Sequence, residues 1–156
     1  MLIKVFGSAF FGVEATTITI EVDIVKGVGY HLVGLPDNAI KESNYRIAAA
    51  LQNNQFKIPG KRITINMAPA DLRKEGSAYD LPIAMGILAA SGQIKSKDIG
   101  NYLIMGELSL DGSVRHVKGV LPMAALAREE GYERLIVPLE DADEAALIPD
   151  LAIIPV

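Results

Sequence analysis

The residue with the clearest potential for chemistry is Ser77, in the stretch DLRKEGSAYDLPIA (71–84). The charged turn Lys74-Glu75-Gly76 precedes this serine, and an apolar helix is expected to begin just after it. Hydrolases place serine nucleophiles on glycine-containing turns of this kind. A serine hydroxyl attacks efficiently only when a base within hydrogen-bond reach takes its proton, and the candidate base is Lys118 in GSVRHVKGV. The two stretches therefore predict either a serine–lysine active site or the outline of one without its chemistry.

Other residue types that support catalysis or metal binding are scarce. The chain has no cysteine, which excludes disulfides, thiolate nucleophiles and cysteine-based zinc sites. We interpret Glu107 and Asp111 as strand-end and turn residues, because the sequence offers no further ligands for a metal beside them. Asp80 is interpreted as a helix cap. No G-x-x-x-x-G-K-[ST] phosphate loop occurs. We therefore expect no metal site and no nucleotide site in residues 1–156.

The elements that must position these residues alternate between strands and helices. The clearest strand is 16–25, because Ile18, Ile20, Val22 and Ile24 alternate with polar residues. Further strands are expected over 2–12, 30–36, 62–67, 134–138 and 151–156, with two more around the Asp111-Gly112 turn within 102–117. Helices are expected from Asp37 to 53, from Asp80 to 91, over 121–131 and over 141–147. This order predicts an α/β (α+β) fold, a mixed sheet packed with helices.

Composition restricts the class of protein further. The chain has 156 residues and a net charge of −4, which suits one globular domain and lacks the basic excess of many phosphate-binding proteins. No apolar run approaches the roughly 18 residues that a membrane span needs. The N-terminus lacks a signal-peptide core. We therefore expect a cytoplasmic protein without membrane partners.

The basic residues form three groups along the chain. If these groups converge, they would create a positive patch for nucleic-acid phosphates or for an acidic surface on the rest of the protein. The alternative is that they are solvated loop charges. The candidate contact residues are Lys57, Lys61, Arg62, Arg73, Lys74, Arg115 and Lys118.

Four stretches together resemble one family: GLPDNAIKES, ITINMAPADLRKEGSAYDLPIAMGILAASGQI, GELSLDGSVR and the helix containing Pro122. They resemble the N-terminal domain of the magnesium-chelatase-like, ComM-type AAA+ proteins of bacteria. The resemblance implies a Lon-protease-like fold (ribosomal protein S5 domain 2-like), similar also to the C-terminal domain of RadA. We accordingly interpret residues 1–156 as a single Lon-protease-like domain, an N-terminal fragment without its AAA+ module. The resemblance implies no cofactor for this fragment, and ATP and magnesium for the ATPase module.

The same resemblance assigns the positions of a peptidase site. Lon-type peptidases carry a serine after Gly-Pro and a lysine on a later helix. Matching these motifs places Ser77 at the proline position, Ala78 at the nucleophile and Leu121 at the base. This implies that the fragment has no catalytic residue. The alternative is a residual serine peptidase that uses Ser77 and Lys118, which requires both loops to shift until the two side chains lie about 3 Å apart.

The resemblance also implies a role for the whole protein. The family's function is ATP-driven DNA branch migration during competence and DNA recombination, with a hexameric ring as the working form. This domain would then serve oligomer assembly, DNA guidance or coupling to the motor. Its partners would be its own AAA+ module, neighbouring subunits of the ring, and DNA. A third alternative, insertion of magnesium into a porphyrin, has no feature in this chain to support it.

Overall fold

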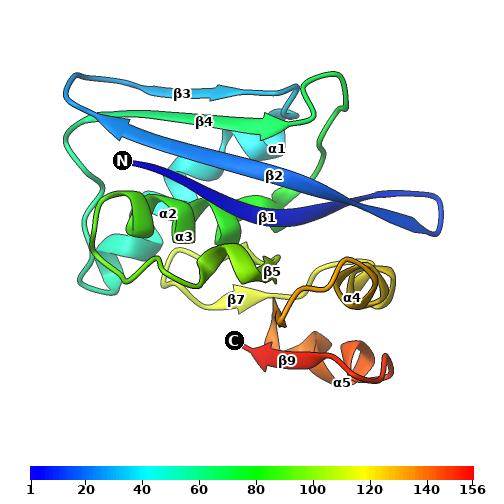
Figure 1. Ribbon diagram of the computed structural model, residues 1–156. Helices are drawn as coiled ribbons and strands as arrows, with labels where there is room; N and C mark the ends of the chain where they lie inside the picture. Colours follow the sequence, from blue (N-terminus) through cyan, green and yellow to red (C-terminus); the bar gives the residue numbers. More distant parts are fainter.

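The computed structural model describes residues 1–156, and its centre is a seven-stranded mixed sheet (Figure 1). The strands lie in the order β3-β4-β2-β1-β5-β8-β9. Their bounds are β1 Leu2–Phe11, β2 Glu14–Val25, β3 Tyr30–Val33, β4 Arg62–Ala68, β5 Tyr102–Ile104, β8 Arg134–Val137 and β9 Ala152–Pro155. A separate hairpin joins β6 (Glu107–Leu108) to β7 (Val114–Arg115). The predicted mixed α/β class is confirmed.

The β1–β2 hairpin is the longest element of the sheet, and it extends past the helices at the right of Figure 1. A two-residue turn at Gly12 and Val13 joins the strands, and Gly12 adopts the positive φ (62°) that such turns require. The isoleucines and valine that alternate along β2 are buried, which confirms the period-2 prediction for residues 16–25. On its other side β1 meets β5 through a single registered pair, Phe6↔Leu103.

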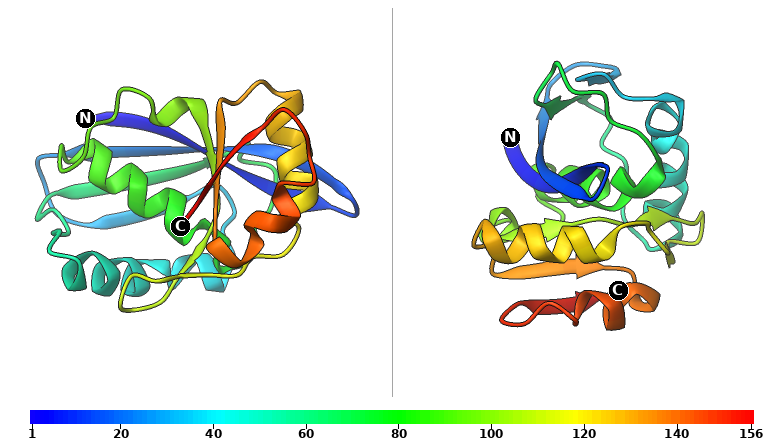
Figure 2. Two further views of the ribbon diagram at one scale, coloured as in Figure 1. Left: turned by 90° about the horizontal axis from the view of Figure 1, so that it is seen from below. Right: turned by 90° about the vertical axis from the view of Figure 1, so that its right-hand side faces the viewer.

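Five α-helices flank the sheet: α1 Asn38–Lys41, α2 Ser43–Asn53, α3 Asp80–Ala90, α4 Val120–Glu129 and α5 Ala142–Ala145. Asp37 caps α1 as predicted, because its Oδ1 accepts the N–H of Ile40 at 2.9 Å. Helix α3 is buried on nearly every side and packs across β1 and β2. Helix α4 lies between the β1–β2 hairpin and β8 (Figure 2). None of these helices combines the length and the apolar composition that crossing a bilayer would demand.

The prediction that Asp80 caps α3 is wrong. The N-cap of α3 is Tyr79, and Asp80 is the first helical residue. Its buried carboxylate accepts hydrogen bonds from Arg46 of α2, at 2.7 Å to Oδ2 and 2.9 Å to Oδ1, and from the N–H of Leu108 at 3.1 Å. Burial raises the pKa of the Asp80 carboxyl, and the Arg46 guanidinium opposes that rise. The ion pair thus joins α2, the start of α3 and β6.

Candidate functional site

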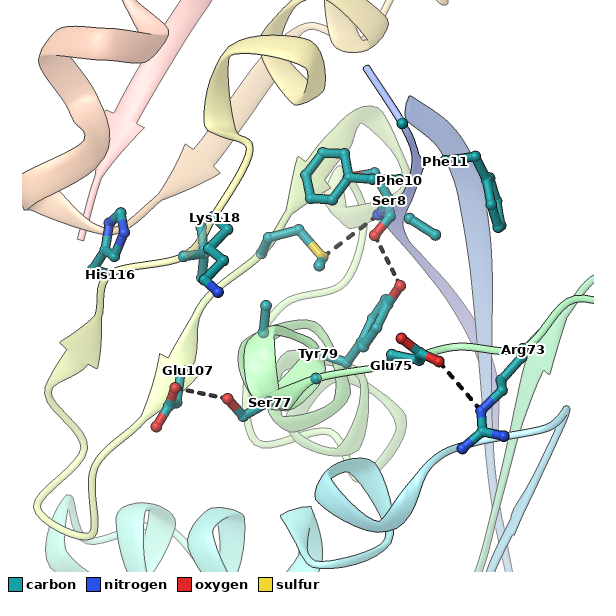
Figure 3. A pocket seen from close by; sticks show the side chains of 16 residues that line it. Ser8, Phe10, Phe11, Arg73, Glu75, Ser77, Tyr79, Glu107, His116 and Lys118 are labelled. Atoms are coloured by element: carbon teal, nitrogen blue, oxygen red, sulfur yellow. Dashed lines mark hydrogen bonds and ion pairs between the residues drawn. The ribbon is translucent and has the colours of Figure 1, made fainter. Parts of the chain in front are cut away.

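A cavity of about 690 Å³ lies beside the end of β1 (Figure 3). Four segments form its wall: the last residues of β1 with Gly12, Arg73 with residues 75–79, Met105 and Glu107 around the start of β6, and residues 116–118 before α4. These segments are remote in sequence, and the sheet brings them together. The cavity therefore contains Ser77, Ala78 and Lys118, the residues that the sequence singles out for a peptidase site.

Ser77 lies on a short turn, η1 (Ser77–Tyr79), directly before α3. Gly76 precedes it with a φ of 93°, and the Gly76 N–H donates to Asp37 Oδ2 at 2.9 Å. The Ser77 hydroxyl donates to Glu107 Oε2 at 2.7 Å. The hydroxyl is therefore held by a carboxylate and makes no hydrogen bond to a lysine.

Lys118 lies on the loop between β7 and α4, and its side chain points into the cavity from the side opposite Arg73 (Figure 3). None of the ion pairs in the structure includes Lys118. Leu121, which the resemblance matches to the catalytic base, lies half-buried in the first turn of α4 and does not line the cavity. Of the two positions considered for a base, only that of Lys118 therefore lines the cavity.

The floor beside β1 is made by residues that the sequence analysis did not identify. The Tyr79 hydroxyl donates to the carbonyl oxygen of Ser8 at 2.9 Å, and the Ser8 N–H donates to Met105 Sδ at 3.5 Å. Burial raises the pKa of Tyr79 far above its ordinary value, so its phenol stays neutral. The one available signal was the position of Tyr79, two residues after Ser77.

The loop that carries Lys118 is fixed to η3 (Leu139–Asp141). The Val117 N–H donates to Asp141 Oδ2 at 2.9 Å, and His116 Nδ1 makes a hydrogen bond with Oδ1 of the same carboxylate. This bond to Asp141 raises the pKa of His116. The buried Asp141 carboxylate therefore holds the wall of the cavity in place.

Lys74 is the basic residue for which the interpretation as a surface contact is wrong. Its side chain is completely buried, and its ammonium donates to the carbonyl oxygens of Gly34, at 2.7 Å, and of Pro69. Desolvation lowers the pKa of Lys74. The residue ties two loops together beneath the surface, so it is unavailable to DNA or to a partner.

The remaining basic residues do not all gather into one patch, although Arg73 and Lys118 line the same cavity. Lys57 and Lys61 line a second cavity of about 500 Å³ beside the first residue of β4, Arg62. The seven residues of β4 separate its ends by roughly 20 Å. Arg73 follows the end opposite Arg62 in the chain and pairs with Glu75 at 3.4 Å. The groups around Arg62 and Arg73 therefore lie at the two ends of one strand.

The third basic group lies on the β6–β7 hairpin and the loop that follows it. Arg115 is exposed on β7, and its Nε donates to Ser109 Oγ at 2.5 Å. Lys118 belongs to the cavity wall. No group of three or more histidine, aspartate or glutamate side chains in the structure is arranged to hold a metal ion.

These features define the class of the molecule: a mixed α/β domain whose cavity is lined by a serine, a carboxylate and a lysine, with the serine bonded to the carboxylate. The family model described as subunit ChlI of Mg-chelatase matches residues 20–141. The chain belongs to this Mg-chelatase subunit ChlI family, which confirms the resemblance found in the sequence.

Individual relatives agree with this assignment. The chain is 48% identical to competence protein ComM of Haemophilus influenzae, over 94% of this chain and 29% of that protein. It is 45% identical to the uncharacterized protein YifB of Escherichia coli, over 90% of this chain and 28% of that protein. A weaker similarity, 26% identity, links it to a Lon protease of Leptospira interrogans, over 92% of this chain and 17% of that protein. The chain thus spans less than a third of the length of these relatives.

Proposed function

We propose that residues 1–156 act as a non-catalytic domain of a magnesium-chelatase-like AAA+ ATPase and serve the assembly of its ring. The observation that carries the proposal is that the cavity lacks an activated serine. The Ser77 hydroxyl is bound by Glu107, an alanine stands at position 78, and Leu121 lies outside the cavity. A Lon-type mechanism needs a serine activated by a neighbouring base, and this arrangement supports a role without peptide hydrolysis.

The placement of the basic residues favours assembly over DNA guidance. A DNA-guiding surface would gather its cations along one path so that several phosphates are met together. Here Arg73 and Lys118 share a cavity that carboxylates also line, and Arg73 is paired with Glu75. The group around Arg62 lies at the other end of β4, and Lys74 is buried. For the whole protein we propose ATP-dependent branch migration of DNA, in line with the family resemblance and with the name of its Haemophilus influenzae relative, competence protein ComM.

Exposed apolar side chains at the tip of the β1–β2 hairpin support a subunit contact. Phe11 is 53% exposed and Val13 is 88% exposed, at the end of an arm that extends past the helices (Figure 1). Apolar side chains displayed together at such a tip gain free energy when a neighbouring surface covers them. We therefore place the proposed ring contact at this tip.

The proposal is tested on the full-length protein with its ATPase module, by light scattering after size-exclusion chromatography in the presence of ATP. We expect Val13→Glu to reduce the mass of the assembled species. Val28→Glu is the matched control, because Val28 is an equally exposed valine (90%) on a different turn. Full assembly of the Val13→Glu variant would contradict the assembly role at this tip.

DNA guidance is tested with the 156-residue chain by fluorescence anisotropy with single- and double-stranded DNA at low and moderate salt. We expect no binding by this chain. Binding that weakens steeply with salt would assign the DNA contact to this domain. Charge reversal of Arg73 and Arg115 would then identify the surface involved.

A further inference from the structure

The strand β1 has an unpaired edge where it borders the cavity. Phe11 and Glu14 flank the two-residue turn, so their backbone groups hydrogen-bond to each other. Hydrogen-bonded and non-hydrogen-bonded pairs alternate along an antiparallel ladder, so the odd-numbered residues of β1 are the ones that hydrogen-bond to β2. The even-numbered residues direct their N–H and C=O groups to the opposite side, toward β5. The ladder with β5 consists of the pair Phe6↔Leu103 alone. From Ser8 onward no strand lies beside this edge.

The free backbone groups on this edge belong to Phe10. At Ser8 the N–H donates to Met105 Sδ and the C=O accepts the Tyr79 hydroxyl, so both groups are used within the fold. Phe10 lies two residues further and directs its N–H and C=O to the same side. No hydrogen bond outside the regular elements involves Phe10. An edge with a free donor and a free acceptor is a template for strand addition.

The cavity beside this edge has the size of a ligand site and contains a lysine that makes no ion pair. Its volume of about 690 Å³ falls in the usual range for ligand pockets. Arg73 is paired with Glu75, and His116 is bound to Asp141. Lys118 has no ion-pair partner, and its ammonium points into the cavity (Figure 3).

We propose that the free edge of β1 binds an extended peptide segment of a partner protein as an added strand, with a carboxylate side chain of that segment paired to Lys118. The peptide backbone would bond to the N–H and C=O of Phe10, and its side chain would enter the cavity. Nucleic acid fits this edge less well, because strand addition needs a partner whose backbone carries both N–H donors and C=O acceptors. The inference goes beyond the proposed assembly role and stands without it.

The backbone part of the proposal is tested by titrating the isotope-labelled chain with the blocked peptide acetyl-Thr-Val-Glu-Val-Thr-amide and following the amide resonances by NMR. We expect shifts centred on Phe10 and Gly12. Phe10→Pro removes the N–H that points away from β2 and should weaken binding roughly fivefold relative to Phe10→Ala, the control that removes only the ring. Equal binding by the two variants, or no shifts up to millimolar peptide, would overturn the proposal.

The pairing of the peptide carboxylate with Lys118 is tested separately, by changing the peptide glutamate and the exposed Lys118 one at a time and together. Replacing the glutamate of the peptide by glutamine should weaken binding roughly fivefold, and Lys118→Gln should produce the same loss. The two changes together should cost no more than one of them. Additive losses, or equal affinity for both peptides, would refute the pairing with Lys118. Shifts of the same amides by a single-stranded DNA oligonucleotide, with none by the peptide, would instead assign the edge to nucleic acid and overturn the proposal.

Discussion

Replacing Asp80 by alanine is expected to destabilise the domain by about 3 kcal/mol. The Asp80 side chain is 1% exposed and accepts hydrogen bonds from Arg46 and from the Leu108 N–H. Removing one partner of a buried ion pair costs about 3–5 kcal/mol, and an unsatisfied N–H adds about 1–3 kcal/mol. The Arg46 side chain is 20% exposed, so water recovers part of this loss. Burial also raises the pKa of Asp80, which means that its charged form is already destabilised in the fold, and this further reduces the free energy lost on substitution.

The assay is urea unfolding and thermal unfolding, each followed by circular dichroism, combined with a double-mutant cycle between Asp80→Ala and Arg46→Met. A loss of about 3 kcal/mol should lower the Tm by roughly 6–12 °C in a domain of this size. The cycle should show a coupling free energy of at least about 1 kcal/mol, because the two side chains form one hydrogen-bonded unit. Glu42→Gln is the control: Glu42 is 68% exposed and 3.9 Å from Arg46, so its loss should be below about 0.5 kcal/mol. A loss under about 1 kcal/mol for Asp80→Ala, or additive single variants, would refute this reasoning.

Three further perturbations have definite expected outcomes. His116→Gln should reduce the Tm below a pH of about 6.5, because Asp141 raises the pKa of His116 and stabilises its protonated ring. The reduction should disappear as the pH rises through the folded-state pKa of His116, and a difference in Tm that stays constant from about pH 5.5 to 9 would contradict this. Gly34→Ala should cost more than about 2 kcal/mol in urea unfolding, because a Cβ there would lie 2.1 Å from Met67 O at a φ of +105°; an unchanged midpoint would contradict it. Gly86→Ala should cost about 1–3 kcal/mol in the same measurement, because its new Cβ would lie 2.6 Å from Val22 Cγ2 and overpack the core. A stabilised variant would contradict this.

Much of the fold could be predicted because its signals are local. The alternation in β2, the cap at Asp37 and the apolar α3 all depend on residues close in sequence, and the structure confirms them. The continuous helix predicted from Asp37 to 53 is divided at Glu42. The pairing of β1 with β5 and of β3 with β4 is parallel and joins distant segments, so no local pattern could indicate it.

The errors at the site arise from contacts that are remote in sequence. Lys74 stands in a charged, glycine-containing turn that is typical of a solvated loop, yet carbonyl groups of Gly34 and Pro69 enclose its ammonium. Asp80 has the residue type and position of a helix cap, yet its partner is Arg46 on another helix. Ser77 and Lys118 were predicted to approach only if both loops shifted, and the sheet brings both to one cavity while the serine bonds to Glu107.

The single registered pair between β1 and β5 has a mechanical consequence. Ten residue pairs hold β1 to β2, whereas Phe6↔Leu103 alone holds β1 to β5. The sheet is therefore two smaller sheets joined along a seam, with β3-β4-β2-β1 on one side and β5-β8-β9 on the other. A force that pulls β9 away from the β1–β2 hairpin is opposed by one registered residue pair at this seam and by ten within the hairpin. The seam should part first, while α4, which packs on both β2 and β8, and the contacts of β6 with η1 and α3 still link the two parts.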